Sequence, residues 1–145
     1  MLNWIAWNAA AASLCPDRAP IRDASVAYAR ERIVFRQPIG RFQMVQEMLS
    51  DMLTGTQAAR LLVHRLARLK DLGEGGQADA SMAKMYASDV AMDAATKAFQ
   101  IHGAYGVSEE YPVGRYLRDA KVFQIVEGNN QLHKALVAES VLGLR

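Results

Sequence analysis

One carboxylate stands where an apolar segment ends, in the stretch FQIVEGNNQ (residues 123–131). This carboxylate is Glu127, and Gly128 follows it directly. A partly desolvated carboxylate is a stronger base than one in water, and glycine leaves room for a ligand to approach the backbone. Glu127 is therefore a candidate general base. The alternative is a surface Glu in a helix–helix turn, with Gly128 as the C-cap.

Two further stretches combine side chains that could contact a ligand. RERIVFRQPIGRFQ carries Arg32, Phe35 and Gln43, which are suited to grip a phosphate and an aromatic ring. It could equally be a polar helix end with Phe35 in the core. QIHGAYG places Gln100 beside Gly103, where the backbone could approach a ligand. The alternative there is an ordinary glycine-rich helix stop.

The elements that must position these residues are predicted to be helices. We expect helices over about 2–14, 20–35, 41–72, 78–101, 112–125 and 129–142. The connector RQPIG, the GEGG turn and the loop 102–112 separate them. Asn129 or Asn130 would cap the last helix and Gly143 would end it. Pro20 would start the second helix at its first position.

The clearest periodicity lies in the helix predicted over 41–72, whose apolar residues recur at three-to-four spacing. The predicted buried face consists of Met44, Val45, Met48, Leu49, Met52, Leu53, Ala59, Leu62, Val63, Leu66 and Leu69. No stretch alternates at period two. Residues 1–145 are therefore expected to form one all-α domain, an up-and-down four-helix bundle with short additional helices.

Composition argues against several classes of function. A formal charge of +2 is too small to indicate a nucleic-acid or anionic-membrane partner. The sequence holds no P-loop, dinucleotide fingerprint, zinc cluster or Glu-x-x-His pair, so no metal is expected. Cys15 is the single cysteine, and the apolar start lacks the basic region of a secretory signal. We expect a cytoplasmic protein.

The order of three motifs is more specific than any one of them. YARERIVFRQPIGRFQ, MAKMYASDVAMDAATKAFQIHGAYG and EEYPVGRYLRDAKVFQIVEGNNQ together resemble the C-terminal helical domain of the acyl-CoA dehydrogenases, over about residues 25–142. The resemblance implies FAD-dependent α,β-oxidation of an acyl-CoA thioester. It also implies that Glu127 abstracts the α-proton and that Gly128 makes room for the substrate thioester.

The resemblance further implies a flavin site shared between subunits of a homodimer or tetramer. Its predicted cofactor contacts are Arg32, Phe35, Gln43, Gln100, Gly103, Ala104, Asn129 and Gln131. The family usually has Gly where Arg36 and Ala104 stand, Thr where Asn129 stands, and often Tyr where Val126 stands.

The family's N-terminal helical domain and β-domain have no counterpart in these 145 residues. We therefore expect weak or absent FAD and no turnover in the isolated chain, unless a separate chain supplies those domains. The alternative function is a non-catalytic helical oligomerisation or interaction module derived from such an enzyme.

Overall fold

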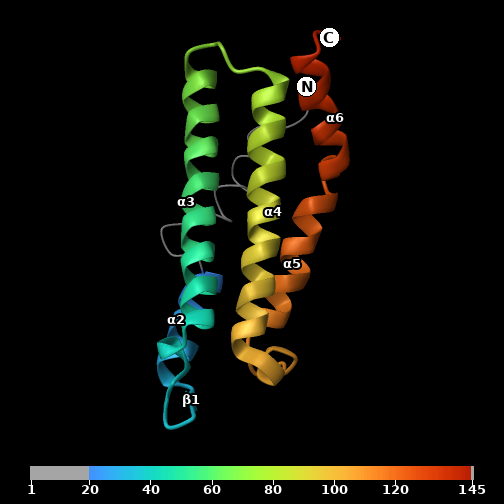
Figure 1. The fold of residues 1–145 in the computed structure, drawn as a ribbon. Helices are drawn as coiled ribbons and strands as arrows, with labels where there is room; N and C mark the ends of the chain where they lie inside the picture. The colour runs from blue at the N-terminus through green and yellow to red at the C-terminus, as the bar shows by residue number, and fades with distance from the viewer. Residues whose placement is uncertain (1–19, 145) are drawn as a thin grey trace.

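The protein is a helical bundle in which one long helix touches all the others (Figure 1). The structure, a computed structural model, describes residues 20–144; the helix predicted over 2–14 lies outside them. The elements are α2 (Pro20–Glu31), β1 (Ile33–Val34), β2 (Gln37–Pro38), η1 (Ile39–Arg41), α3 (Gln43–Asp71), α4 (Gln77–His102), η2 (Gly103–Gly106), α5 (Val113–Ile125) and α6 (Asn130–Val141). The prediction of an all-α bundle is confirmed.

Helix α4 is central because its alanines let several helices approach closely. α3 runs antiparallel to α4 along its whole length, and α5 and α6 lie end to end along another side of α4 (Figure 1). The buried alanines of α4 are Ala83, Ala87, Ala91, Ala94, Ala95 and Ala98. The α5–α6 pair therefore takes the place of a fourth long helix in the bundle. Glu127 lies in the break between α5 and α6.

The apolar face predicted for α3 is buried only along its middle. Met52, Ala59, Val63 and Leu66 are buried, as their spacing predicts. Met44 is 75% exposed and Leu53 is 45% exposed, so the prediction was wrong for these two. Each residue advances about 100° around a helix, so Leu53 lies about 100° from Met52, outside the buried arc.

The second predicted helix ends earlier than expected. α2 stops at Glu31, and Ile33–Val34 pair antiparallel with Gln37–Pro38 in a short hairpin. Phe35 and Arg36 form its two-residue loop with φ of 50° and 65°. Two successive positive φ values are typical of the type I′ hairpin turn. The predicted helix through Phe35 was therefore wrong, and the connector predicted over 36–40 contains the second strand of this hairpin.

The remaining helix limits agree with the sequence to within a few residues. Asn129 is the N-cap of α6, and its side chain accepts a hydrogen bond from the Leu132 amide at 2.9 Å. Gly143 follows that helix with φ of +67°. No helix within residues 20–144 is both long and apolar enough to cross a membrane.

Candidate functional site

Glu127 lies in the break between α5 and α6 in an unusual backbone conformation. α5 ends at Ile125, and Glu127 follows with φ of +57°, in the left-handed region that non-glycine residues rarely occupy. Gly128 has φ of +91°, and a Cβ there would lie 3.2 Å from Nε2 of His133. The backbone conformation and packing of the turn therefore favour glycine at this position.

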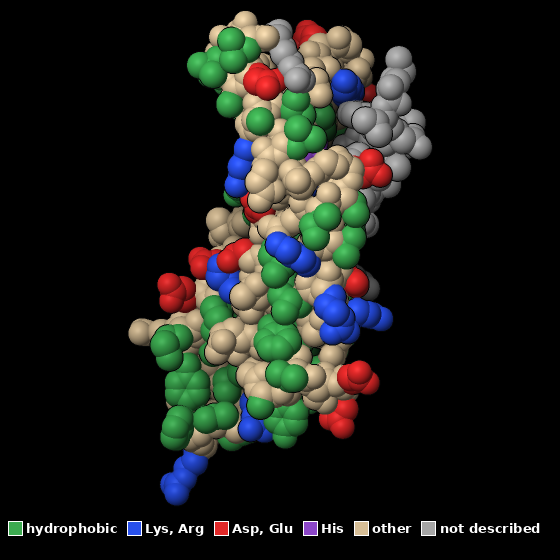
Figure 2. All heavy atoms as spheres, turned by 90° about the vertical axis from the view of Figure 1, so that its right-hand side faces the viewer, with side chains coloured by type: hydrophobic (Ala, Val, Ile, Leu, Met, Phe, Trp, Pro, Cys, Tyr) green, Lys and Arg blue, Asp and Glu red, His purple; other side chains and the backbone are tan. Residues whose placement is uncertain are grey.

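The Glu127 side chain is exposed and has apolar neighbours along the chain. Val126 is 40% exposed, Ile125 59%, and Leu132 at the start of α6 is 51% exposed. Figure 2 turns the α5–α6 side toward the viewer and shows hydrophobic side chains spread over its lower part. If another protein surface docked over this turn, these three apolar side chains and the Glu127 carboxylate would all be removed from water.

Two side chains hold the backbone of the turn. Nζ of Lys84 on α4 donates to the carbonyl oxygen of Gly128 at 2.7 Å and to Oδ1 of Asn130 at 2.8 Å. Nε2 of His133 on α6 lies 3.3 Å from the carbonyl oxygen of Glu127, and Nδ1 lies 3.0 Å from Oγ of Ser81. The carbonyls of two consecutive residues are therefore bound from two different helices.

Asn130 links this pair of contacts to α5. It is buried, and its Nδ2 donates to Oγ of Ser88 at 2.8 Å and to Oδ1 of Asp89 at 2.7 Å. The same Oδ1 of Asp89 accepts a hydrogen bond from Nε2 of Gln124 at 2.7 Å. Because buried polar groups cost free energy unless they are hydrogen-bonded, this network specifies how α4, α5 and α6 meet.

The electrostatics of the turn follow from burial. Burial lowers the pKa of Lys84, and the Asp89 carboxylate opposes that shift. Burial, and then the charge of Lys84, lower the pKa of His133 below its usual 6.5, so the ring is neutral at neutral pH. A carbonyl only accepts hydrogen bonds, so Nε2 of His133 carries the proton and Nδ1 accepts from the Ser81 hydroxyl.

Six of the other predicted site residues gather at the opposite end of α4. Phe35 is 86% exposed at the hairpin tip, and the Arg32 guanidinium lies 5.3 Å from the centre of the Tyr105 ring in η2. The structure thus brings the hairpin and the end of α4 together. All six predicted site residues of this end are exposed: Arg32, Phe35, Gln43, Gln100, Gly103 and Ala104.

The chemistry of this end fits an anionic, aromatic cofactor such as FAD, since it offers a guanidinium, an exposed ring and side-chain amides. Ala104, where the family usually has Gly, is not among the described residues with positive φ, so its Cβ costs no backbone strain. Arg36 does have positive φ, a backbone conformation that glycine adopts without strain.

The two groups of site residues do not meet within one chain. Lys84, which contacts the Glu127 turn, and Gln100 are separated by 16 residues of α4 (from 84 to 100), or about 24 Å of helix. Asn129 and Gln131 lie with Glu127 and not with the hairpin. One protomer therefore presents two separate surfaces.

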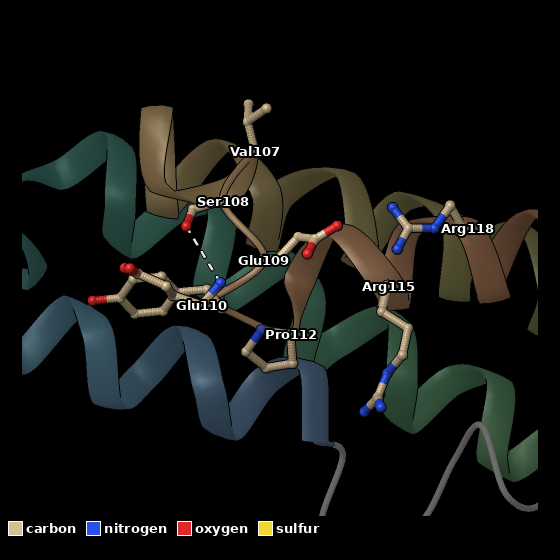
Figure 3. Close-up of a pocket in the computed structure, with 8 residues that line it drawn as sticks. Val107, Ser108, Glu109, Glu110, Pro112, Arg115 and Arg118 are labelled. Atoms are coloured by element: carbon tan, nitrogen blue, oxygen red, sulfur yellow. Dashed lines mark hydrogen bonds between the residues drawn. The ribbon is translucent and has the colours of Figure 1, made fainter.

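Two hollows can be described on the surface of residues 20–144, and Glu127 lines neither of them. One, of about 340 Å³, lies between the loop after η2 and α5; Arg115 and Arg118 project from α5 beside it, and Oγ of Ser108 accepts from the Glu110 amide at 3.3 Å (Figure 3). The other, of about 430 Å³, lies between α3 and α4 around Tyr86 and Val90. Among residues 20–144, no three His, Cys, Asp or Glu side chains are placed to hold a metal ion.

The sequence predictions missed Lys84, His133 and the side chains that support them. A signal was present, because Ser81, Lys84 and Ser88 recur at three-to-four spacing and so share one face of an otherwise alanine-rich helix. Only the docking of α6 shows that this polar face meets the Glu127 turn.

Comparison with known proteins agrees with this architecture. A 40% identical structure, butyryl-CoA dehydrogenase from Megasphaera elsdenii, superposes with a TM-score of 0.87 over 96% of this chain and 36% of its own. The structure of a glutaryl-coenzyme A dehydrogenase with glutaryl-CoA superposes with a TM-score of 0.88 at 38% identity, over 98% of this chain and 35% of its own.

The proteins that are similar in sequence also include acyl-CoA dehydrogenases. The chain is 44% identical over 133 residues to the short-chain specific acyl-CoA dehydrogenase of Megasphaera elsdenii, and 43% identical over 120 residues to cyclohexane-1-carbonyl-CoA dehydrogenase of Geobacter metallireducens. These matches cover 92% and 83% of this chain, but only 34% and 32% of the relatives, so the chain spans about a third of their length. The family described as "Acyl-CoA dehydrogenase, C-terminal domain" matches residues 1–142. The chain belongs to the acyl-CoA dehydrogenase family and corresponds to the C-terminal domain of its members.

Proposed function

We propose that this chain supplies the base and part of the flavin surface of an FAD-dependent acyl-CoA dehydrogenase. The observation that carries the proposal is the left-handed conformation of Glu127 in a turn held by hydrogen bonds from two helices. Strained non-glycine residues of this kind concentrate at functional sites, where the surrounding structure maintains them. A merely connecting turn would have no need of a Glu at this position.

In this proposal the Glu127 carboxylate accepts the proton from the α-carbon of an acyl-CoA thioester. The electron pair left at the α-carbon forms the double bond as hydride leaves the β-carbon. FAD, when bound, supplies the acceptor for that hydride. Gly128 leaves space beside the base for the thioester, and the apolar side chains of Val126 and Leu132 help to exclude water once substrate covers them.

The remaining contacts serve the cofactor from the far end of the bundle. Arg32 would donate to the pyrophosphate of FAD, and Phe35 and Gln43 would contact the same cofactor. Gln100, Gly103 and Ala104 would line its adenosine part. Because this end lies about 24 Å along α4 from the Glu127 turn, we propose that the two surfaces of one chain face different flavins. The exposed Asn129 and Gln131 would contact the flavin that Glu127 serves.

We further propose that the active site is assembled between chains, in a homodimer or tetramer or with a chain that carries the rest of the enzyme. The distance between the two surfaces and the 86% exposure of Phe35 support this arrangement. The isolated chain should therefore bind FAD weakly or not at all. A purified chain with stoichiometric flavin absorbance would contradict that expectation.

A domain exchange tests the role of Glu127. Residues 20–144 replace the matching segment of the short-chain specific dehydrogenase from Megasphaera elsdenii, and flavin bleaching by butyryl-CoA is followed without oxygen. Glu127→Gln, which keeps the side-chain shape, should slow bleaching by about 10²–10⁴-fold. Glu109→Gln, an exposed acid in the loop before α5, is the matched control and should leave the rate unchanged.

A non-catalytic oligomerisation module is the second candidate. The exposed Ile33, Phe35 and Met44 at the hairpin end favour it, because such apolar groups are suited to contact another chain. It predicts that Glu127→Gln changes neither the flavin chemistry of the exchanged enzyme nor any property of the purified chain. Full bleaching activity with Gln at position 127 would establish this alternative over the enzymatic one.

A further inference from the structure

We propose that Lys84 and His133 are positioning residues, which together clamp the Glu127–Gly128 turn and so aim the carboxylate of Glu127. This inference rests on the proposed function for its catalytic meaning. Its structural content, a turn held by two named side chains, can be tested without any activity.

The geometry shows how a clamp of two side chains can set the turn. The carbonyl of Glu127 belongs to the peptide plane before Gly128, and the carbonyl of Gly128 belongs to the plane after it. His133 binds the first carbonyl and Lys84 binds the second. Because a peptide plane is rigid, holding both planes limits the rotations at Gly128 and the ψ angle of Glu127. These rotations decide where the Glu127 side chain points.

Burial indicates that Lys84 has a specific task. Lys84 is 2% exposed, on a buried face of α4 that also carries Ser81 and Ser88. Removing an ammonium group from water costs free energy, and apolar residues of similar volume often replace buried ions without loss of stability. Hydrogen bonds from a charged donor are about twice as strong as neutral ones, so Lys84 is suited to hold a strained turn.

The clamp residues are themselves held in place. Oγ of Ser81 orients the His133 ring through Nδ1. Nδ2 of Asn130 is bound by Ser88 and Asp89, which leaves Oδ1 of Asn130 facing Nζ of Lys84. Lys84 reaches residues 128 and 130 from α4, and His133 reaches residues 81 and 127 from α6. The clamp therefore exists only when α6 is docked on α4.

The test is Lys84→Met in the full chain, with Lys97→Met as the matched control. Lys97 lies on the same helix, is partly buried, and pairs with Asp93 at 2.5 Å and Asp51 at 3.3 Å, away from the turn. Both variants lose a partly or fully buried ammonium. Only Lys84→Met removes a contact with the Glu127–Gly128 turn.

Amide hydrogen exchange of Leu132 is the readout, because its N–H donates to the Asn129 cap directly after the turn. We expect Lys84→Met to speed this exchange by about tenfold relative to the amide of Val63 in the core of α3, which reports global unfolding. Lys97→Met should leave that ratio unchanged. His133→Phe should act in the same direction but less, since its bond to Glu127 is longer.

The effect on activity is tested in the chimeric dehydrogenase described above, in which residues 20–144 replace the matching segment of the Megasphaera elsdenii enzyme. Lys84→Met should slow flavin bleaching by about 10–100-fold at saturating butyryl-CoA with little change in half-saturating concentration, because the base is displaced while substrate binding is kept. If Lys84→Met leaves the ratio of the Leu132 and Val63 amide exchange rates unchanged, the clamp proposal is wrong. Loss of the clamp with full bleaching activity shows that positioning is irrelevant to the reaction. Full activity of Glu127→Gln instead defeats the proposed function and leaves the clamp to be judged by exchange alone.

Discussion

Replacing Gly128 by Ala gives a direct measure of how tightly the turn is packed. Gly128 has φ of +91°, and an added Cβ would lie 3.2 Å from Nε2 of His133 and 3.3 Å from Cδ2 of Leu132. Contacts at these distances require the neighbours to move. His133 is the neighbour whose movement matters, because its Nε2 also contacts the carbonyl of Glu127.

Three contributions determine how much Gly128→Ala changes the free energy of unfolding. A left-handed conformation costs a non-glycine residue about 1–2 kcal/mol, and the smaller unfolded-state entropy of Ala returns about 0.4–1 kcal/mol. Loosening the contact between His133 and Glu127 costs a further 0.5–1.5 kcal/mol or so. Gly128→Ala should therefore lower the free energy of unfolding by about 1–2 kcal/mol.

Gly73→Ala is the matched control, because Gly73 has φ of +76° and open space where its Cβ would stand. It should lose only the backbone part, about 0.5–1 kcal/mol. Urea unfolding of both variants, followed by far-ultraviolet circular dichroism, gives the difference. Equal losses in the two variants would refute the contact between residue 128 and His133.

Two other predictions concern strain and pH. Glu127→Gly and Arg36→Gly each relieve a positive φ, at +57° and +65°, so each should raise the free energy of unfolding by about 0.5–1 kcal/mol in the same urea assay, and a loss of stability would contradict the backbone assignment. The lowered pKa of His133, caused by burial and by the charge of Lys84, means that below its usual 6.5 the unfolded chain binds a proton that the folded chain does not. Stability should therefore fall as pH drops below 6.5 and be unaffected by this group above it. His133→Gln should lose less stability than the wild type between about pH 7.5 and about pH 5, and identical losses would exclude the effect.

Local sequence signals predicted most of the helices correctly. The glycines at 73–76 and the caps at Asn129 and Gly143 depend on backbone chemistry of a few neighbouring residues. The apolar spacing of Met52, Ala59, Val63 and Leu66 likewise acts within one helix. Such patterns carry their information locally, so an all-α bundle followed from the sequence.

The hairpin was missed because its competing signals are nearly balanced. Arg30, Glu31 and Arg32 favour a continuing helix, whereas Ile33 and Val34 are β-branched. The loop also lacks the glycine or asparagine that usually marks a type I′ turn. Core packing decided the outcome: the amide of Ile39 closes the hairpin by donating to the carbonyl of Arg32 at 2.9 Å, and the buried Ile39 belongs to the same core cluster as Ala29.

The sequence by itself determined that a lone carboxylate, Glu127, precedes a glycine between two helices, and its motifs indicated the family. Only the tertiary structure decided that Glu127 is left-handed and that Lys84, 44 residues before Gly128 in the chain, binds the turn. The reason is physical: which polar side chain meets which carbonyl depends on how α6 docks on α4. No periodicity within either helix contains that information.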